Sequence, residues 1–250
     1  MDPLFEFCLR MGDNTLVLGH RVSQWCGHAP VVEEDIALAN TALDLIGQTQ
    51  LWLGLAGEVE GKGRDADALA FRRDAWDFRS VLLVEQPNGD FGNTLLRQYL
   101  FDEWQALMLA ALKRSTDTRV AAIAAKAAKE VAYHVERSRG TVVGLGDGTA
   151  ESHAKMQAAL DRLYPFVGEL FATDATDEAV AEAGIAPLPS DLRAAYDAAL
   201  AATMAEATLT IPDSRWTHAG GRDGSRHSEH LGHLLTEMQW LQRAYPDATW

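Results

Sequence analysis

The chain has 250 residues, of which 47% are hydrophobic and 23% charged, as is typical of a globular protein with enough length to bury a core. Its formal net charge of −14 argues against nucleic acid or an anionic membrane as the main partner. A basic protein partner, or a phosphate-bearing ligand in a local basic pocket, remains compatible with this charge.

The N-terminal residues 1–14 (MDPLFEFCLRMGDN) contain neither a basic segment nor a long apolar run, so we expect no signal peptide. No stretch approaches eighteen uninterrupted apolar residues, so we expect no membrane span. Cys8 and Cys26 are too few for a disulfide framework, and we expect both to be buried thiols. These features predict a cytoplasmic protein.

Helical periodicity dominates the first part of the chain. It predicts helices over 4–25 and 32–59, separated by a turn at 26–30 that contains glycine and proline. Gly12 and Gly19 weaken the first helix but would let another helix approach closely. Residues 69–87 are predicted to be a long connection with short helical pieces, followed by a turn at 87–90.

Further helices are predicted over 90–114, 118–143 and 149–172. Asp117 is the expected N-cap of the second, and Pro165 predicts a kink or break in the third. The more polar remainder predicts helices near 177–184, 190–209 and 226–245. We therefore predict an all-α, ferritin-like helix bundle. It would form a single domain over 1–250, with a core bundle over 1–172 and an extension of short helices over 173–250.

The alanine-rich segment 121–144 contains one histidine, His134. In helix bundles that hold a carboxylate-bridged metal pair, Glu-x-x-His places both ligands on one inward face. Here Val131 lies three residues before His134, and Glu130 lies four before it. None of the other seven histidines has a carboxylate three residues earlier either. The standard di-iron ligand pair is therefore absent from the sequence.

A second group of histidines lies near the C-terminus. On a helix, His227, His230 and His233 could share one face, with Glu237 one turn further, and histidine is a common zinc ligand. The alternative is a helix start capped by Ser228, with the histidines packed against the preceding loop or against another protein chain. The segment lacks the His-Glu-x-x-His motif of a metalloprotease.

The loop before these histidines is rich in arginine. Arg215, Arg222 and Arg226 could bind a phosphate or a carboxylate, or could form a solvated or partner-facing surface. The glycine-rich residues 144–148 follow a predicted helix rather than a strand, which favours a helix link over a nucleotide-binding loop. No Gly-x-Ser-x-Gly nucleophile motif occurs.

A set of motifs spread over the whole chain is shared with one known family. They are GDN at 12–14, WCGHAP at 25–30, ALAN at 37–40, LDL at 43–45, LVEQPN at 83–88, KE at 129–130, YH at 133–134, EHLG at 229–232, EMQ at 237–239, and the closing Trp250. Together they make the chain resemble the structural C subunits of bacterial phenylacetyl-CoA epoxidases, also called phenylacetate-CoA oxygenases.

The resemblance implies a ferritin-like subunit related to its own catalytic partner, the di-iron A subunit. Where that partner carries Asp-Glu-x-Gly-His, this chain has Asp44, Leu45 and Gln48, so a leucine and a glutamine replace two ligands. Where it carries Lys-Glu-Glu-x-x-His, Val131 replaces another ligand. The glutamate of its first helix falls near Thr15.

The resemblance thus implies a degenerate, metal-free pseudo-site and no catalytic or cofactor-binding residue in this chain. Its members are Asp44, Leu45, Gln48, Asp102, Glu130, Val131 and His134. Of the ligands, Asp102 and His134 survive. We expect a buried Asp102 to pair with Lys126 or Lys129, or with His134.

The function implied is that of a non-catalytic structural subunit that binds and stabilises the di-iron A subunit. The complex would convert phenylacetyl-CoA into its ring-1,2-epoxide with O₂ and with electrons from NADPH, through a reductase subunit with flavin and iron–sulfur. Homodimers in the absence of the partner fit the same picture. Arg215, Arg222, His227 and His230 are the expected partner contacts.

Two alternatives stay open at this point. The chain could be a catalytic ferritin-like oxygenase with an unconventional metal site at Asp44, Asp102, Glu130 and His134. It could also be a zinc-binding scaffold that uses its C-terminal histidines. Iron and zinc content would distinguish these alternatives from the structural subunit.

Overall fold

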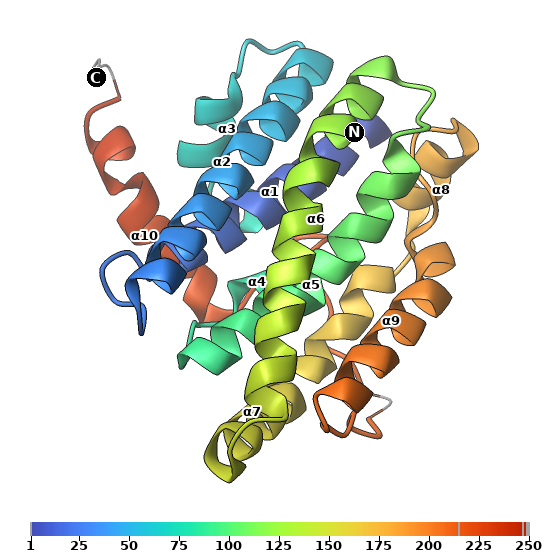
Figure 1. Ribbon diagram of the computed structural model, residues 1–250. Coiled ribbons are helices and arrows are strands. Elements are labelled where there is room, and N and C mark those ends of the chain that lie inside the picture. The colour runs from blue at the N-terminus through green and yellow to red at the C-terminus, as the bar shows by residue number, and fades with distance from the viewer. Residues whose placement is uncertain (1, 215, 247, 249–250) are drawn as a thin grey trace. The chain divides into compact units, whose positions relative to one another are not determined.

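The computed structural model describes residues 2–214, 216–246 and 248, so Arg215 and Trp250 lie outside the described residues. In this part of the chain every regular element is a helix (Figure 1), and the predicted all-α class is confirmed. None of its helices is long and apolar enough to cross a membrane.

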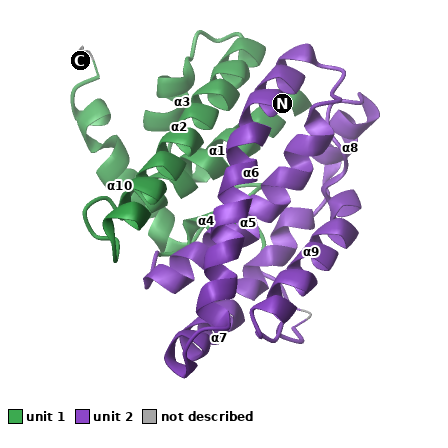
Figure 2. Cartoon of the chain, viewed as in Figure 1, with its two compact units in different colours: residues 1–87, 219–250 green, residues 88–218 purple. Residues whose placement is uncertain are grey.

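The chain divides into two compact units (Figure 2): Met1–Pro87 with Ala219–Trp250, and Asn88–His218. These limits differ from the predicted division at residue 172. Within the predicted C-terminal extension, α8 (Ala175–Glu182), η3 (Pro189–Leu192) and α9 (Arg193–Glu206) fall in the second unit, while α10 (Glu229–Ala244) falls in the first. The single-domain organisation stays a prediction.

The first unit is built on α1 (Pro3–Ser23) and α2 (Val32–Glu60), whose bounds lie within two residues of the predicted ones. Asp2 caps α1, since its carboxylate accepts from the backbone N–H of Leu4 at 2.8 Å. The α2 helix ends at Gly61, which adopts the left-handed conformation with φ 67°.

The two glycines of α1 allow α2 to pack closely, as predicted. A Cβ at Gly12 would lie 2.5 Å from Leu53 Cδ2, and one at Gly19 would lie 3.1 Å from Ile46 Cδ1. Because Gly12 meets residue 53 while Gly19 meets residue 46, the helices run antiparallel. The close packing leaves Leu45 and Trp52 with no exposed surface.

The connection after α2 contains α3 (Ala66–Phe71), η1 (Ala75–Asp77) and α4 (Leu82–Glu85), in line with the predicted short helical pieces. Two side chains of the GDN motif hold it. The fully buried Asp13 pairs with both terminal nitrogens of Arg73 and accepts from the Arg79 N–H at 2.8 Å. Asn14 Oδ1 accepts from the Val81 N–H at 2.8 Å.

The second unit is built on α5 (Phe91–Leu112) and α6 (Thr118–Gly146), followed by α7 (Ala150–Leu163), η2 (Tyr164–Phe171), α8, η3 and α9. Asp117 caps α6 as predicted and accepts from the Arg119 N–H at 2.9 Å. Pro165 breaks the predicted fifth helix, since α7 ends at Leu163 and a 3₁₀ segment follows.

One expectation about the cysteines is wrong. Cys8 is fully buried on α1, but Cys26 is exposed. Cys26 lies in the turn between α1 and α2, where the chain has no second layer to cover it.

Candidate functional site

The residues of the predicted pseudo-site lie in both units, and each half is described within its own unit. Asp44, Leu45 and Gln48 lie on α2 in the first unit; Asp102 lies on α5, and Glu130, Val131 and His134 lie on α6, in the second. Three of the long helices, α2, α5 and α6, thus carry the predicted positions, and the side-chain contacts decide what each residue can do.

Asp102 is the centre of the half on α5 and α6. It is fully buried, and both of its carboxylate oxygens accept hydrogen bonds. Gln98 Nε2, one turn earlier on α5, donates to Oδ1 at 2.6 Å, and Ser138 Oγ on α6 donates to Oδ2 at 2.9 Å. The expected lysines are not its partners, because Lys126 and Lys129 are exposed on α6.

Burial decides the charge state of Asp102. Loss of water raises the pKa of this carboxyl from 3.8 to about 6, against the opposing effects of His134, the donors Ser138 and Gln98, and Arg137. His134 is itself buried, at 2% exposed. The expected interaction between Asp102 and His134 is therefore present as an electrostatic one. Two neutral donors complete the surroundings of the carboxylate.

The positions next to His134 on α6 differ in their environment. Val131 has no exposed surface, while Glu130 is only half-buried. Consecutive residues on a helix point about 100° apart, so a carboxylate at 130 does not take the place of one at 131. The buried face of α6 therefore has an apolar side chain, Val131, at this position.

The half on α1 and α2 is also filled by protein contacts. Leu45 is fully buried, Gln48 is 1% exposed and Asp44 is half-buried. Thr15 Oγ lies 2.9 Å from Thr49 Oγ, in a buried hydroxyl pair that joins α1 to α2. A buried hydroxyl pair thus lies where the resemblance places the glutamate of the first helix.

A di-iron centre requires several carboxylates and two histidines directed at one point. Within the described residues, no group of three or more His, Cys, Asp or Glu side chains is arranged to hold a metal ion. The oxygens of Asp102 are engaged by Gln98 and Ser138, and Leu45 and Val131 supply no donor atom. The residues present do not fit a di-iron centre.

A second buried carboxylate, Glu85, was not found by sequence reasoning. It lies at the end of α4, fully buried, and accepts from Ser80 Oγ at 3.1 Å, His227 Nδ1 at 2.6 Å and the Ser228 N–H at 2.7 Å. Arg21 Nη2 donates to the carbonyl oxygens of Glu85 and His230, at 3.1 and 2.9 Å. The sequence feature that could have revealed this buried carboxylate is that Glu85 is the one charged residue of the LVEQPN motif.

The Glu85 cluster changes the interpretation of the C-terminal histidines. The His227 side chain is 5% exposed and directed at Glu85, so it anchors the segment before α10, and its role as a partner contact stays a prediction. Ser228 is at the N-cap position, but its side chain makes no capping bond; its backbone N–H donates to Glu85. Of the other expected contacts, Arg222 and His230 are half-buried, and Arg215 is outside the described residues.

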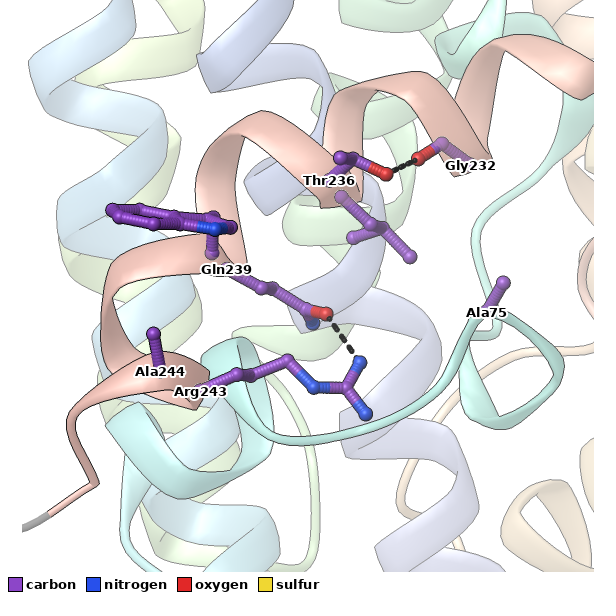
Figure 3. Close-up of a pocket in the computed structure, with 8 residues that line it drawn as sticks. Ala75, Gly232, Thr236, Gln239, Arg243 and Ala244 are labelled. Carbon is purple, nitrogen blue, oxygen red and sulfur yellow. Dashed lines mark hydrogen bonds between the residues drawn. The ribbon is translucent and has the colours of Figure 1, made fainter.

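An open groove of about 520 Å³ lies between α10 and η1 in the first unit, lined by Ala75, Gly232, Leu235, Thr236, Gln239, Trp240, Arg243 and Ala244 (Figure 3). Its polar side chains are bound to the protein itself. Gln239 donates to the Ala70 and Arg73 carbonyls and accepts from Arg243 at 3.2 Å, and Thr236 donates to the Gly232 carbonyl. The groove presents no set of groups suited to catalysis.

Comparison with known proteins gives two findings. The family model for the phenylacetic acid catabolic protein matches residues 1–250. A curated relative, the C subunit of the 1,2-phenylacetyl-CoA epoxidase of Escherichia coli (strain K12), is 49% identical over 250 residues, which cover 100% of both chains. These matches confirm the resemblance drawn from the motifs.

Proposed function

Because this chain belongs to the phenylacetic acid catabolic protein family, we propose that it is the C subunit of a 1,2-phenylacetyl-CoA epoxidase complex in phenylacetate catabolism. In this role it is a non-catalytic, structural subunit. It binds the di-iron catalytic subunit and stabilises that subunit in the cytoplasm.

The surroundings of Asp102 are the observation that carries this proposal. In a working centre, a carboxylate at this position would turn an oxygen toward metal. Here both oxygens accept hydrogen bonds from Gln98 and Ser138, and hydrocarbon side chains stand at 45 and 131. Replacing ionised ligands with apolar side chains removes the charge that would otherwise need a cation. The four long helices, α1, α2, α5 and α6, are then kept as a ferritin-like scaffold.

The chemistry of the complex is assigned to the other subunits. The di-iron centre of the partner would activate O₂ for epoxidation of the aromatic ring of phenylacetyl-CoA. A reductase subunit with flavin and an iron–sulfur centre would deliver electrons from NADPH. This chain contributes binding surface and stability, and it binds no cofactor.

Co-expression with the catalytic subunit tests the proposal. We expect a stable complex in size-exclusion chromatography and epoxidation of phenylacetyl-CoA that depends on this chain when reductase and NADPH are supplied. A catalytic subunit that forms no complex with this chain and is fully active alone would overturn the proposal.

A further inference from the structure

The long helix α2 (Figure 1) carries few charges along its middle. Between residues 36 and 57 its only charged residue is Asp44. The other polar residues of this range are uncharged, and two of them, Asn40 and Gln50, are exposed.

One face of α2 is exposed. Val32 is 70% exposed, Ile36 57% and Leu43 70%, at spacings that place them on one side of the helix. Gly47 continues the same side, and a Cβ added there would meet nothing within 4 Å. We call Val32, Ile36, Leu43 and Gly47 the apolar face of α2; the exposed polar residues Asn40 and Gln50 lie on the same side. The buried residues Leu38, Leu45 and Trp52 lie on the opposite side.

The charges of α2 restrict what can cover this face. The helix contains Glu33, Glu34 and Asp35 at its start, Asp44 in the middle, and Glu58 and Glu60 at its end, but no Lys, Arg or His. Glu60 is already paired with Lys62 and Arg64, so the charges that can face a partner lie mainly in the first turn and the middle of the helix. A second copy of the chain packed on it through the same face, in either direction, would bring carboxylates against carboxylates at both ends. A partner helix with an apolar strip between Lys or Arg side chains would meet complementary charge.

We infer that the apolar face of α2 binds a helix of a different polypeptide, apolar along its centre and flanked by Lys or Arg. This inference rests on the proposed function above, which makes that polypeptide the catalytic subunit. Leu43 lies at the centre of the contact, and Gly47 leaves room for the partner helix to approach closely. The exposed Glu33 supplies one of the charges at the edge of the face.

Two substitutions at the surface test the apolar face of α2 without changing the packing of the protein interior. Leu43→Asp places a charge at the centre of the contact, and Gly47→Leu fills the open space where the partner would approach. Both sites are exposed or open, so each variant should keep the helix content of the wild type, and Gly47→Leu should melt at the same or a higher temperature because leucine favours helix. We expect each to weaken binding to the catalytic subunit by about ten-fold or more, measured by calorimetry.

One further variant is a control and another tests the charge at the edge of the face. Trp240→Asp changes a 61% exposed apolar side chain on α10 and should change the dissociation constant by less than about two-fold. Glu33→Lys should weaken binding more at low than at high salt, because a screened charge pair contributes less.

The outcomes separate this inference from the proposed function. If the wild type binds the catalytic subunit and both α2 variants bind equally well, the face is not the contact, while the structural role stands. If the variants change only self-association of this chain, the face binds a second copy and the inference is wrong. If the wild type does not bind the catalytic subunit, both fail.

Discussion

The residue on which the proposed metal-free role most depends is Asp102. An acid with no exposed surface usually binds a cation or an arginine, because an isolated buried charge is costly. Asp102 accepts hydrogen bonds from two neutral donors, Gln98 and Ser138, and has His134 and Arg137 as electrostatic neighbours, and its pKa is raised to about 6. A structural role for this carboxyl group belongs to the proposed function.

The raised pKa of Asp102 predicts a pH-dependent stability. The folded state favours the protonated acid, so this contribution is fully present below pH 3.8 and is lost as pH rises through about 6. Asp102→Asn removes the titration and keeps a hydrogen-bonding side chain of the same shape. Relative to the wild type, the variant should gain about 2 kcal/mol in free energy of unfolding between about pH 4.5 and about pH 8.

Urea denaturation of both proteins across this pH range measures the difference directly. Glu136→Gln, which changes an exposed acid on α6, is the control, and its free energy of unfolding should vary with pH in the same way as that of the wild type. If the free energy of unfolding of Asp102→Asn also varied with pH as the wild type does, the raised pKa would be contradicted.

Some residue-level features could be predicted from the sequence and others could not. The burial of Leu45 and Val131 agrees with their predicted inward positions, while the loss of ligands at Leu45, Gln48 and Val131 stays a prediction from the resemblance. The partners of Asp102 were wrongly expected among the lysines of α6. Ser138 donates a hydrogen bond to Asp102 but lies 36 residues away along the chain, and no local sequence pattern indicates that contact.

At the scale of elements, local signals predicted the helices well. Asp117 caps α6 and Pro165 breaks the helix predicted over 149–172, because each acts on backbone groups next to it in the chain. The anchors between elements were missed. Arg73 binds Asp13 across 60 residues, and His227 binds Glu85 across 142.

Glu85 is predicted to fix the C-terminal helix to the first unit. Glu85→Ala removes the acceptor for His227, Ser228 and Ser80 from a fully buried site and should lower the free energy of unfolding by about 3 kcal/mol. Hydrogen exchange should show faster opening of α10 than of α1. Unchanged protection of α10 amides would contradict this role, and Glu85→Gln, which keeps an acceptor oxygen, should show a smaller effect.

Two glycines of α2 provide a matched pair. A Cβ at Gly57 would lie 2.0 Å from the Arg64 carbonyl oxygen, whereas one at Gly54 would meet nothing within 4 Å. Gly57→Ala should therefore destabilise the protein by about 2 kcal/mol, and Gly54→Ala should stabilise it by up to about 1 kcal/mol through helix propensity. Thermal denaturation measures both, and equal shifts would show that the turn after α2 is not closely packed.

At the scale of the whole molecule, the composition of the chain suits a member of a larger complex. The acidic charge is concentrated on helices such as α2, where an exposed apolar face has no cover within the described residues. The sequence predicted a single domain with a C-terminal extension. That organisation stays a prediction. Within the first unit α10 is grouped with α1 and α2: Glu85 binds the N–H of Ser228, just before α10, and Arg21 binds the carbonyl of His230 in its first turn.

A structural subunit should be stabilised by its partner. Binding to the folded state alone raises the free energy of unfolding, by about 2.7 kcal/mol when the partner is present at a hundred times the dissociation constant. We expect the melting temperature of this chain to rise with the concentration of added catalytic subunit. A melting temperature that stays constant over that titration would contradict a stabilising complex.

The most direct test of a metal-free structural role is the iron content of this chain. The chain is purified alone and reconstituted anaerobically with Fe(II), with the catalytic subunit treated in parallel. We predict that iron stays with the catalytic subunit, at about two ions per chain, and that none is retained by this chain after desalting. About two irons retained per copy of this chain would contradict the structural role and would make it an oxygenase in its own right.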